Sequence, residues 1–272
     1  MFKLWKKLPK RIKNKVAIGW YEALSRFNSG DDLAFMNHGF APMRGDPEII
    51  ELPASLENDR YAIQLYHVLA DTISWRGKHV VEISSGRGGG AAYIFYFFKP
   101  ETYLGVDLAR SAVDHCNETY ADRHGLSFMV GDAQEMPLHD ACCDILINVE
   151  SSVNYPDQES FFSEVNRVLR PGGFLLLQDH RTAKKMDLLK KSLTDLNFEL
   201  VKMEDISSNV ARALRLDDPR KQELLLQRVP KPFRRLVGEF SFTGAAARDE
   251  IDRFRNGKKC YIMAVLRKPL LN

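Results

Sequence analysis

The sequence predicts an α/β fold in which a mostly parallel sheet is covered by helices on both faces. From Lys78 to about Asp179, short apolar runs alternate with helical stretches, as they do in βαβ units. A turn with four glycines in five residues, Gly86 to Gly90, follows the first of these runs. Acidic residues, Asp107 and Asp132, follow the second and third apolar runs. Because ligands of open parallel sheets bind beyond the carboxyl ends of the strands, these residues indicate a ligand crevice.

The individual elements follow from local apolar patterns. An irregular apolar loop is expected over residues 35–42 and a helix from about residue 55 to 73. The helix before the fifth strand is expected to end at Arg170-Pro171-Gly172-Gly173, because proline and glycine end helices and form turns. Further helices are expected over 91–98, 184–196 and most of 207–256, and strands over 79–83, 102–106, 126–130, 144–149, 173–178, 198–203 and 259–267.

Two regions are distinguished along the chain. Residues 1–59 form an N-terminal segment, and residues 60–272 form the main domain, with a charged helical insertion at about 207–256 that is suited to cover the crevice as a lid. The first fifteen residues hold seven cations among apolar side chains. This pattern suits contact with an anionic membrane surface. A solvated tail also accounts for it, because Pro9 interrupts any helix there.

Composition argues against several classes of protein. The 272 residues carry 39 Lys and Arg against 36 Asp and Glu, a formal charge of +3 that is too small to indicate a nucleic-acid partner. The four cysteines form no C-x-x-C motif, so neither a zinc knuckle nor a disulfide framework is predicted. No apolar run approaches the ~20 residues of a membrane span, and no signal peptide is recognised. A reduced, cytoplasmic location is expected, with any membrane contact peripheral.

The glycine turn and three acids near it predict the kind of ligand. Gly86-x-Gly88-x-x-Ala91 fits a loose dinucleotide fingerprint, although a tight turn without a ligand also accounts for it. Asp107 ends the second strand, where a carboxylate accepts hydrogen bonds from ribose hydroxyls. Asp132 follows the third strand, where it can accept one from an adenine amine. Glu82 precedes the turn and would repel a pyrophosphate but attract the methionyl end of S-adenosylmethionine, so the acids favour S-adenosylmethionine over a nicotinamide dinucleotide.

These motifs resemble those of class I S-adenosylmethionine-dependent methyltransferases. Glu82-x-Ser84-x-Gly86-x-Gly88 is similar to the family's first motif, with Ser84 where a glycine is commonest. The resemblance covers about residues 78–180 and implies a Rossmann-like sheet of seven mostly parallel strands. The cofactor contacts that it implies are Glu82, Ser84, Gly86, Gly88, Asp107, Leu108, Asp132, Ala133 and Asn148.

A closer resemblance extends over most of the chain. Three segments resemble the phthiotriol/phenolphthiotriol dimycocerosate and glycopeptidolipid O-methyltransferases, which methylate hydroxyl groups on lipids or glycosylated natural products. This resemblance implies a hydroxylated, largely apolar small molecule as acceptor, and aromatic side chains of the outer segments suit such a molecule. The segments are Phe35-Met36-Asn37-x-Gly39, Asn148-Val149-Glu150-Ser151-Ser152-x-x-Tyr155-Pro156 and Ile206-x-x-Asn209-Val210-x-x-Ala213-Leu214, and the aromatics are Trp20, Tyr21, Phe35, Phe40, Tyr155, Phe240 and Phe242.

The chain departs from this group at the general base. Members often carry a histidine where this chain has Val153. The candidates for taking the acceptor's proton are therefore His180, with Asp179 to orient or assist it, then His38, and then Glu150. The alternatives are a surface position for His180, loop packing for His38, and a cofactor or loop contact for Glu150. Asp179, His180 and Glu150 are also conceivable metal ligands, but no metal-spaced motif supports them and no metal is predicted.

Three functions are weighed on the sequence. The leading hypothesis is an S-adenosylmethionine-dependent O-methyltransferase that acts on a hydroxyl of a lipid-like, polyketide or glycosylated natural product. The second is a nicotinamide-dependent oxidoreductase on the same glycine turn, which Glu82 and Asp132 disfavour. The third is a non-catalytic relative that keeps the fold as a binding module, and the departure at Val153 is the observation that favours it.

Overall fold

The computed structural model describes residues 34–270 apart from 47–48, 230, 232–233, 235–236 and 239–241. The basic segment 1–15, and with it the predicted membrane contact, lies outside the described residues, as do three of the aromatics named above (Trp20, Tyr21 and Phe240). In the described part of the chain, no helix combines the length and the apolar character needed to cross a bilayer.

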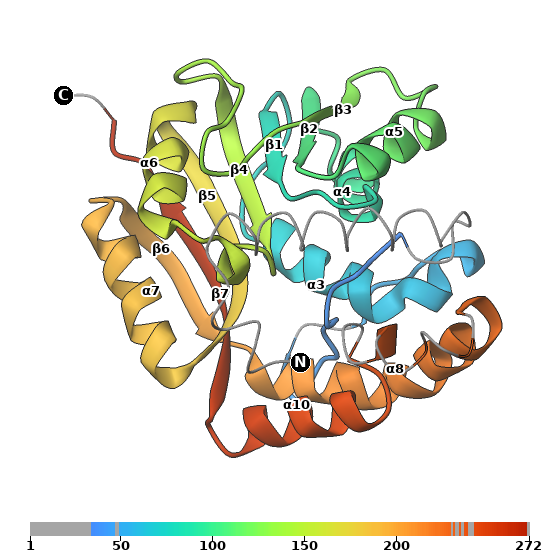
Figure 1. The fold of residues 1–272 in the computed structure, drawn as a ribbon. Coiled ribbons are helices and arrows are strands. Elements are labelled where there is room, and N and C mark those ends of the chain that lie inside the picture. The colour runs from blue at the N-terminus through green and yellow to red at the C-terminus, as the bar shows by residue number, and fades with distance from the viewer. Residues whose placement is uncertain are drawn as a thin grey trace.

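Seven strands form one sheet in the order β3-β2-β1-β4-β5-β7-β6 (Figure 1). β7 is antiparallel to its neighbours β5 and β6, and the other neighbouring pairs are parallel, which confirms the predicted sheet. The strand order reverses beside β1, which lies between β2 and β4, and ligands of such sheets bind at this switch point. The strands are β1 (His79–Ile83), β2 (Thr102–Asp107), β3 (Leu126–Val130), β4 (Cys143–Val149), β5 (Leu169–Thr182), β6 (Glu199–Asp205) and β7 (Lys259–Arg267).

Alternating side chains of the strands build a separate hydrophobic core on each face of the sheet. Val80 and Ile145 belong to one core, and the next residues along their strands, Val81 and Leu146, belong to the other, because successive side chains of a strand point to opposite faces. Helices α3, α4, α5, α8 and α10 contribute to the first core, and α6 and α7 to the second. The helices are α3 (Arg60–Ala70), α4 (Gly89–Phe98), α5 (Arg110–Thr119), α6 (Gln158–Val168), α7 (Ala183–Asp195), α8 (Ser207–Arg228) and α10 (Ala245–Arg255), with 3₁₀-helices η2 (Ala54–Asp59) and η3 (Ser152–Asn154).

The fifth strand is longer than the sequence predicts. The expected turn at residues 170–173 lies inside β5, because its glycines exchange backbone hydrogen bonds with Lys268 just beyond β7. At the other end, the last four residues of β5 pair with the first four of β7. Asp179 and His180 are therefore interior residues of the strand rather than residues beyond its end.

The N-terminal loop and the late helices meet at the carboxyl end of the sheet. The described loop residues 34–46 contain no helix or strand, as the sequence predicts, whereas the helix expected from about residue 55 is 3₁₀ in its first part and becomes α-helical at Arg60. The amide of Asn209 in α8 donates to the carbonyl of Ala41 at 3.3 Å and thereby fastens the loop to the insertion. Within the insertion, α8 and α10 pack against each other beneath the sheet in Figure 1.

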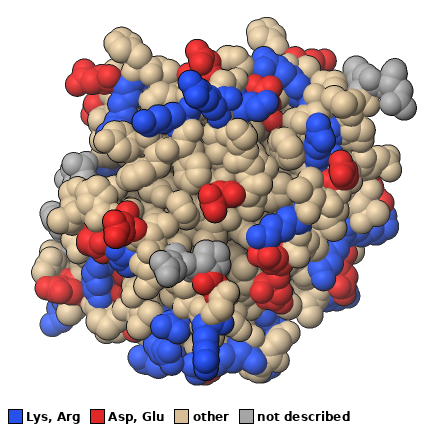
Figure 2. Space-filling view, turned by 180° about the vertical axis from the view of Figure 1, so that it is seen from behind, with Lys and Arg blue, Asp and Glu red and all other residues tan. Residues whose placement is uncertain are grey.

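Figure 2 shows the opposite side of the molecule from Figure 1. Lys and Arg side chains recur beside Asp and Glu around the rim of this side, and its middle is largely uncharged. Charges of both signs are thus interspersed around the rim, in keeping with the near balance of charge in the sequence.

Candidate active site

The glycine turn connects β1 to α4 through left-handed backbone conformations. Ser84, Gly86 and Gly88 have φ angles of 63°, 55° and 77°, a region that favours glycine. Ser84 takes this conformation although it carries a side chain, and its hydroxyl lies 2.7 Å from the hydroxyl of Tyr155. At Gly90, a Cβ atom would lie only 2.1 Å from a ring carbon of Tyr66, so a larger residue does not fit. The missing side chain at Gly90 therefore lets the ring of Tyr66 pack directly against the backbone.

Asp107, the last residue of β2, supports this turn. Its Oδ2 accepts a hydrogen bond from the backbone N–H of Gly86 at 2.8 Å, and its Oδ1 accepts one from Ala109 at 2.9 Å. Asp107 therefore lies at the carboxyl end of a parallel strand and beside the glycine turn, the position at which folds of this kind bind ribose hydroxyls. The neighbouring Leu108 is 43% exposed and offers an apolar surface on which a base can stack.

Two further predicted contacts follow β3. Asp132 is partly exposed, and its Oδ1 accepts hydrogen bonds from the backbone and side-chain amide of Gln134 at 2.8 and 3.0 Å. Ala133 is buried beside it. Both residues therefore lie past the carboxyl end of a strand that neighbours β2, where the sequence places them.

Asn148 is engaged by the protein rather than presented to a ligand. Its fully buried amide donates to the carbonyl of Ile83 at 3.1 Å and to the hydroxyl of Tyr155 at 2.9 Å, while its Oδ1 accepts from the N–H of Ser152 at 3.2 Å. It therefore ties the loop after β4 to the end of β1.

Glu82 is likewise hydrogen-bonded within the protein. Its side chain is 1% exposed, and its two oxygens accept hydrogen bonds from the hydroxyls of Tyr66 and Tyr103 at 2.7 and 2.9 Å. Burial raises the pKa of Glu82 to about 7, although the tyrosine hydroxyls work in the opposite direction. The carboxyl lies beneath the glycine turn, so any influence on a ligand there acts through its charge.

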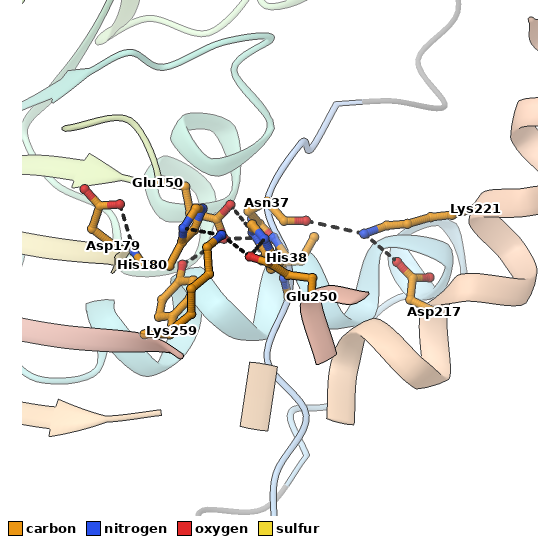
Figure 3. A network of polar contacts seen from close by, with 12 residues as sticks. Asn37, His38, Glu150, Asp179, His180, Asp217, Lys221, Glu250 and Lys259 are labelled. Carbon is orange, nitrogen blue, oxygen red and sulfur yellow. Dashed lines mark hydrogen bonds and ion pairs between the residues drawn. The ribbon is translucent and has the colours of Figure 1, made fainter. Parts of the chain in front are cut away.

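Three of the four candidate catalytic side chains converge at the ends of β4 and β5 (Figure 3). His38 Nδ1 lies 2.5 Å from Glu150 Oε2, and the rings of His38 and His180 have their centroids 4.6 Å apart. His38 and His180 are buried, at 2% and 9% exposure. Residues from the N-terminal loop, from the end of β4 and from within β5 are thus brought together.

Glu150 is the anchor of this cluster. Its Oε1 accepts hydrogen bonds from the backbone N–H of His38 and from the hydroxyl of Tyr261, each at 2.8 Å. Its own backbone is left-handed, with a φ of 53°. A non-glycine residue in this conformation is strained, and such strain persists where the surrounding contacts hold it in place. Glu150 is therefore held by the loop, by β7 and by its own turn.

The electrostatic environment assigns different proton affinities to the three groups. Burial tends to raise the pKa of Glu150, but the adjacent His38 outweighs it and brings this pKa down to about 2. Burial tends to lower the pKa of His38, but the carboxylates of Glu150 and Glu250 outweigh it, so this pKa is raised above the usual 6.5. Burial, with smaller contributions from His38 and Lys259, lowers the pKa of His180 to about 3. His180 is consequently a neutral and weakly basic neighbour of the His38–Glu150 pair.

Asp179 does not orient the ring of His180, contrary to the expectation from sequence. The two residues are consecutive within β5, so their side chains point to opposite faces of the sheet. The carboxylate of Asp179 accepts hydrogen bonds from the hydroxyl of Ser152 and, at 3.1 Å, from Arg181, and it contacts only the backbone N–H of His180. Asp179 is a fully buried partner of Arg181.

Two charged residues of the cluster were not identified from the sequence. Glu250 of α10 forms an ion pair with Lys259 of β7, and its Oε1 lies 3.8 Å from His38 Nε2. The Lys259 ammonium lies 3.4 Å from His180 Nδ1. Neither residue belongs to a recognisable motif, and Glu250 lies in a stretch where acids and bases alternate, which is usual for an exposed helix.

The same cluster is the candidate metal site among the residues that the structure describes. His38, Glu150 and His180 each offer a donor atom, and these atoms all lie within 4.8 Å of one another. Two donors on one zinc ion, with bonds of about 2.0–2.1 Å, lie about 3 Å or more apart. The 2.5 Å contact between His38 and Glu150 is instead that of a hydrogen bond, and the Lys259 ammonium adds a positive charge beside His180. The geometry favours a shared proton over a metal ion.

The loop that carries His38 also lies against the glycine turn. A Cβ atom on Gly86 would be 3.3 Å from the terminal carbon of Met36, and one on Gly89 would be 2.6 Å from the carbonyl oxygen of Ala34. Residues 34–38 therefore run from the glycine turn to Glu150. This short path places a histidine next to the predicted cofactor site.

Comparisons with known proteins identify the family of the chain. A family model described as "Methyltransferase domain" matches residues 81–177. The chain is 38% identical to the "Fatty-acid O-methyltransferase" of Mycolicibacterium smegmatis over 195 residues, which cover 71% of this chain and 70% of that protein. It is 32% identical to the "Probable phthiotriol/phenolphthiotriol dimycocerosates methyltransferase 2" of Mycobacterium ulcerans over 223 residues, which cover 81% and 84%.

Among solved structures, the fold is similar to that of a geranyl diphosphate C-methyltransferase from Streptomyces coelicolor. The TM-score is 0.66, the identity is 16%, and the similarity covers 92% of this chain and 97% of that one. At this identity the likeness shows the fold alone. The family match and the curated relatives carry the functional conclusion: the chain belongs to the methyltransferase family and is an enzyme that uses S-adenosylmethionine as its methyl donor.

Proposed function

We propose that this enzyme transfers the methyl group of S-adenosylmethionine to a hydroxyl oxygen of a lipid-like or glycosylated, largely apolar acceptor, with His38 as the general base. The observation that carries the proposal is the contact between His38 Nδ1 and Glu150. Because Glu150 occupies Nδ1, it fixes the orientation of the ring and leaves Nε2 as the atom that can accept a proton. The sequence ranked His38 second to His180, and the contact with Glu150 supports placing His38 first.

The glycine turn and its neighbours fit the cofactor. Asp107 ends β2 beside the glycine turn, where a carboxylate can bind ribose hydroxyls, and the exposed Leu108 can cover one face of the adenine. Gly86 and Gly88 let the backbone turn sharply between β1 and α4, beside Asp107. Asp132 lies where it can accept a hydrogen bond from the adenine amine. When bound, S-adenosylmethionine supplies an electrophilic methyl group on a positively charged sulfur.

The His38–Glu150 pair handles the proton of the acceptor. Neutral His38 accepts the hydroxyl proton at Nε2 as the oxygen becomes a nucleophile, and the Glu150 carboxylate stabilises the resulting imidazolium through Nδ1. Tyr261 and the backbone N–H of His38 keep Glu150 in place during this step. Val153, where relatives often have a histidine, lies in η3 just after Glu150. In the proposed mechanism, the histidine that acts as the base comes instead from the N-terminal loop, as His38.

The surroundings of the base suit an apolar acceptor. The ring of Phe242 lies 4.3 Å from that of His38, and Phe254 and Tyr261 lie within 6.3 Å. The names of the curated relatives point to lipids as well: a fatty acid for one and phthiotriol-type dimycocerosates for the other. The nicotinamide alternative receives no support from these relatives.

An acceptor panel tests the proposal. The protein is incubated with S-adenosylmethionine and with three matched probes, 1-dodecanol, methyl 3-hydroxydodecanoate and dodecanoic acid, and mass spectrometry locates the added methyl group. We expect a methyl ether on a hydroxylated probe, formed faster as the pH rises through the raised pKa of His38, because only the neutral imidazole accepts a proton. Methyl esters as the sole product, at a rate independent of pH, would contradict a role for a base. Binding of S-adenosylhomocysteine without turnover of any probe would favour the non-catalytic alternative.

A further inference from the structure

His38 lies between two carboxylates that come from opposite sides of its ring. Glu150 contacts Nδ1, and Glu250 faces Nε2 from α10, with its Oε1 at 3.8 Å. Nε2 is buried and has no hydrogen-bond partner at this distance. The side chain of Glu250 is 3% exposed, so water does not screen its charge from the ring.

Glu250 is held in this position by two kinds of contact (Figure 3). Its carboxylate forms an ion pair with the ammonium of Lys259, which is 14% exposed and lies 5.8 Å above the ring of Phe242. The helix beneath it is anchored because Ile251 and Phe254 belong to the hydrophobic core. In the free protein the carboxylate is therefore a buried part of the environment of His38 rather than a surface charge.

The location of Glu250 conflicts with the place of an acceptor. An oxygen that gives its proton to Nε2 must come within about 2.6–3.2 Å of that atom. Glu250 Oε1 is the acidic atom on this side of the ring, so an acceptor that reaches Nε2 has to move the carboxylate aside. The displaced carboxylate can remain ion-paired with Lys259 on β7.

We propose that Glu250 is a positioning residue that keeps His38 protonated in the free enzyme and yields its place to the acceptor, so that the base becomes neutral only when an acceptor is bound. This inference rests on the proposed role of His38 as the base. It assigns to the insertion between β6 and β7 a part in catalysis, namely control over the proton state of a residue in the N-terminal loop.

The charges around His38 indicate that moving Glu250 away favours the neutral form of its ring. The titratable groups that face it are Glu150 after β4, His180 in β5, Glu250 in α10, and Lys259 and Tyr261 in β7. The two carboxylates favour the imidazolium, and both contribute to the raised pKa of His38. Moving Glu250 away removes one of them, so the neutral form becomes more favourable at a given pH.

The test compares Glu250→Gln with a matched control, Asp249→Asn. Asp249 lies one residue earlier on α10, is exposed and pairs with Arg253, so its variant removes the same charge from the same helix without facing His38. The titration of the His38 ring is followed by NMR in the full-length protein, with a His38→Gln variant to assign its signal. We expect a midpoint above 6.5 in the wild type, a fall of roughly one pH unit or more in Glu250→Gln, and no change in Asp249→Asn.

Kinetics on whichever probe acceptor is turned over separate control of the base from simple stabilisation. The pH dependence of kcat/KM reports the free enzyme, and that of kcat reports the enzyme with acceptor bound. We expect Glu250→Gln to move the acidic limb of kcat/KM to lower pH and to leave that of kcat in place, because the acceptor has already displaced the carboxylate. Equal shifts in both profiles would refute displacement.

An unchanged NMR midpoint in Glu250→Gln would refute the influence of Glu250 on His38. If that variant does not fold, the more conservative Glu250→Asp, which withdraws the carboxylate from the ring, should lower the midpoint by a smaller amount. The NMR result does not depend on turnover. A shifted midpoint without any methylation of the probes would therefore refute the proposed function and leave the electrostatic coupling intact.

Discussion

Replacing His38 by glutamine should lower kcat for methylation of a hydroxyl acceptor by about 10²–10⁴-fold, the contribution of a positioned general base. Glutamine keeps a polar side chain of similar reach but accepts no proton at neutral pH. The affinity for S-adenosylhomocysteine should stay within a few-fold of the wild type. His38 contacts Glu150, whereas the proposed ribose contact is Asp107. Single-turnover kinetics at saturating cofactor, together with calorimetric titration, measures both quantities.

The control for this variant is His139→Gln, the same chemical change at an exposed position outside the cluster. It should leave kcat unchanged. Because His38 is buried, the unfolding midpoint of each variant is measured as well, so that loss of folded protein is not taken for loss of catalysis. A His38→Gln variant that is folded and retains wild-type kcat would show that another group takes the proton.

Replacing Asp107 by alanine should weaken the binding of S-adenosylhomocysteine by at least 100-fold. A hydrogen bond to a charged group contributes about 1.5–3 kcal/mol, and two ribose hydroxyls would lose such a partner. The N–H groups of Gly86 and Ala109 would lose theirs as well, so the glycine turn itself would be less well held. Calorimetric titration of the variant measures the affinity.

Asp114→Ala is the matched control for this change. Asp114 is an exposed acid on α5, the helix that follows β2, and its removal alters the net charge by the same amount. Its affinity for S-adenosylhomocysteine should equal that of the wild type. Wild-type affinity in the folded Asp107→Ala variant would refute the ribose contact and, with it, the placement of the nucleoside.

The features that the sequence predicted correctly depend on local patterns. The alternation of apolar runs and helical stretches predicted the strands, and Asp107 ends β2 as expected because a strand, a polar end and a turn are neighbours in sequence. A turn at residues 86–90 was predicted from its four glycines, and its left-handed φ angles at Gly86 and Gly88 are ones that few other residues adopt without strain. Both features belong to the cofactor side of the crevice.

The catalytic side depends on contacts between distant segments, which no local pattern encodes. His38 and Glu150 are 112 positions apart, and they meet only because the N-terminal loop crosses the glycine turn. Asp179 was expected to orient His180, but β5 continues through both residues and their side chains point to opposite faces; that continuation depends on pairing with the start of β7. Glu250 was missed because one buried acid in a charged helix has no distinguishing neighbours in the sequence.

A crystal structure with S-adenosylhomocysteine bound tests the central claim most directly, because it shows where the sulfur lies relative to the base. The account predicts that the ribose hydroxyls contact Asp107, that the adenine packs on Leu108, and that the sulfur points from the glycine turn toward His38 Nε2 with room for one oxygen atom between them. A sulfur directed away from His38, or a nucleoside bound outside the crevice between β1 and β4, would contradict it.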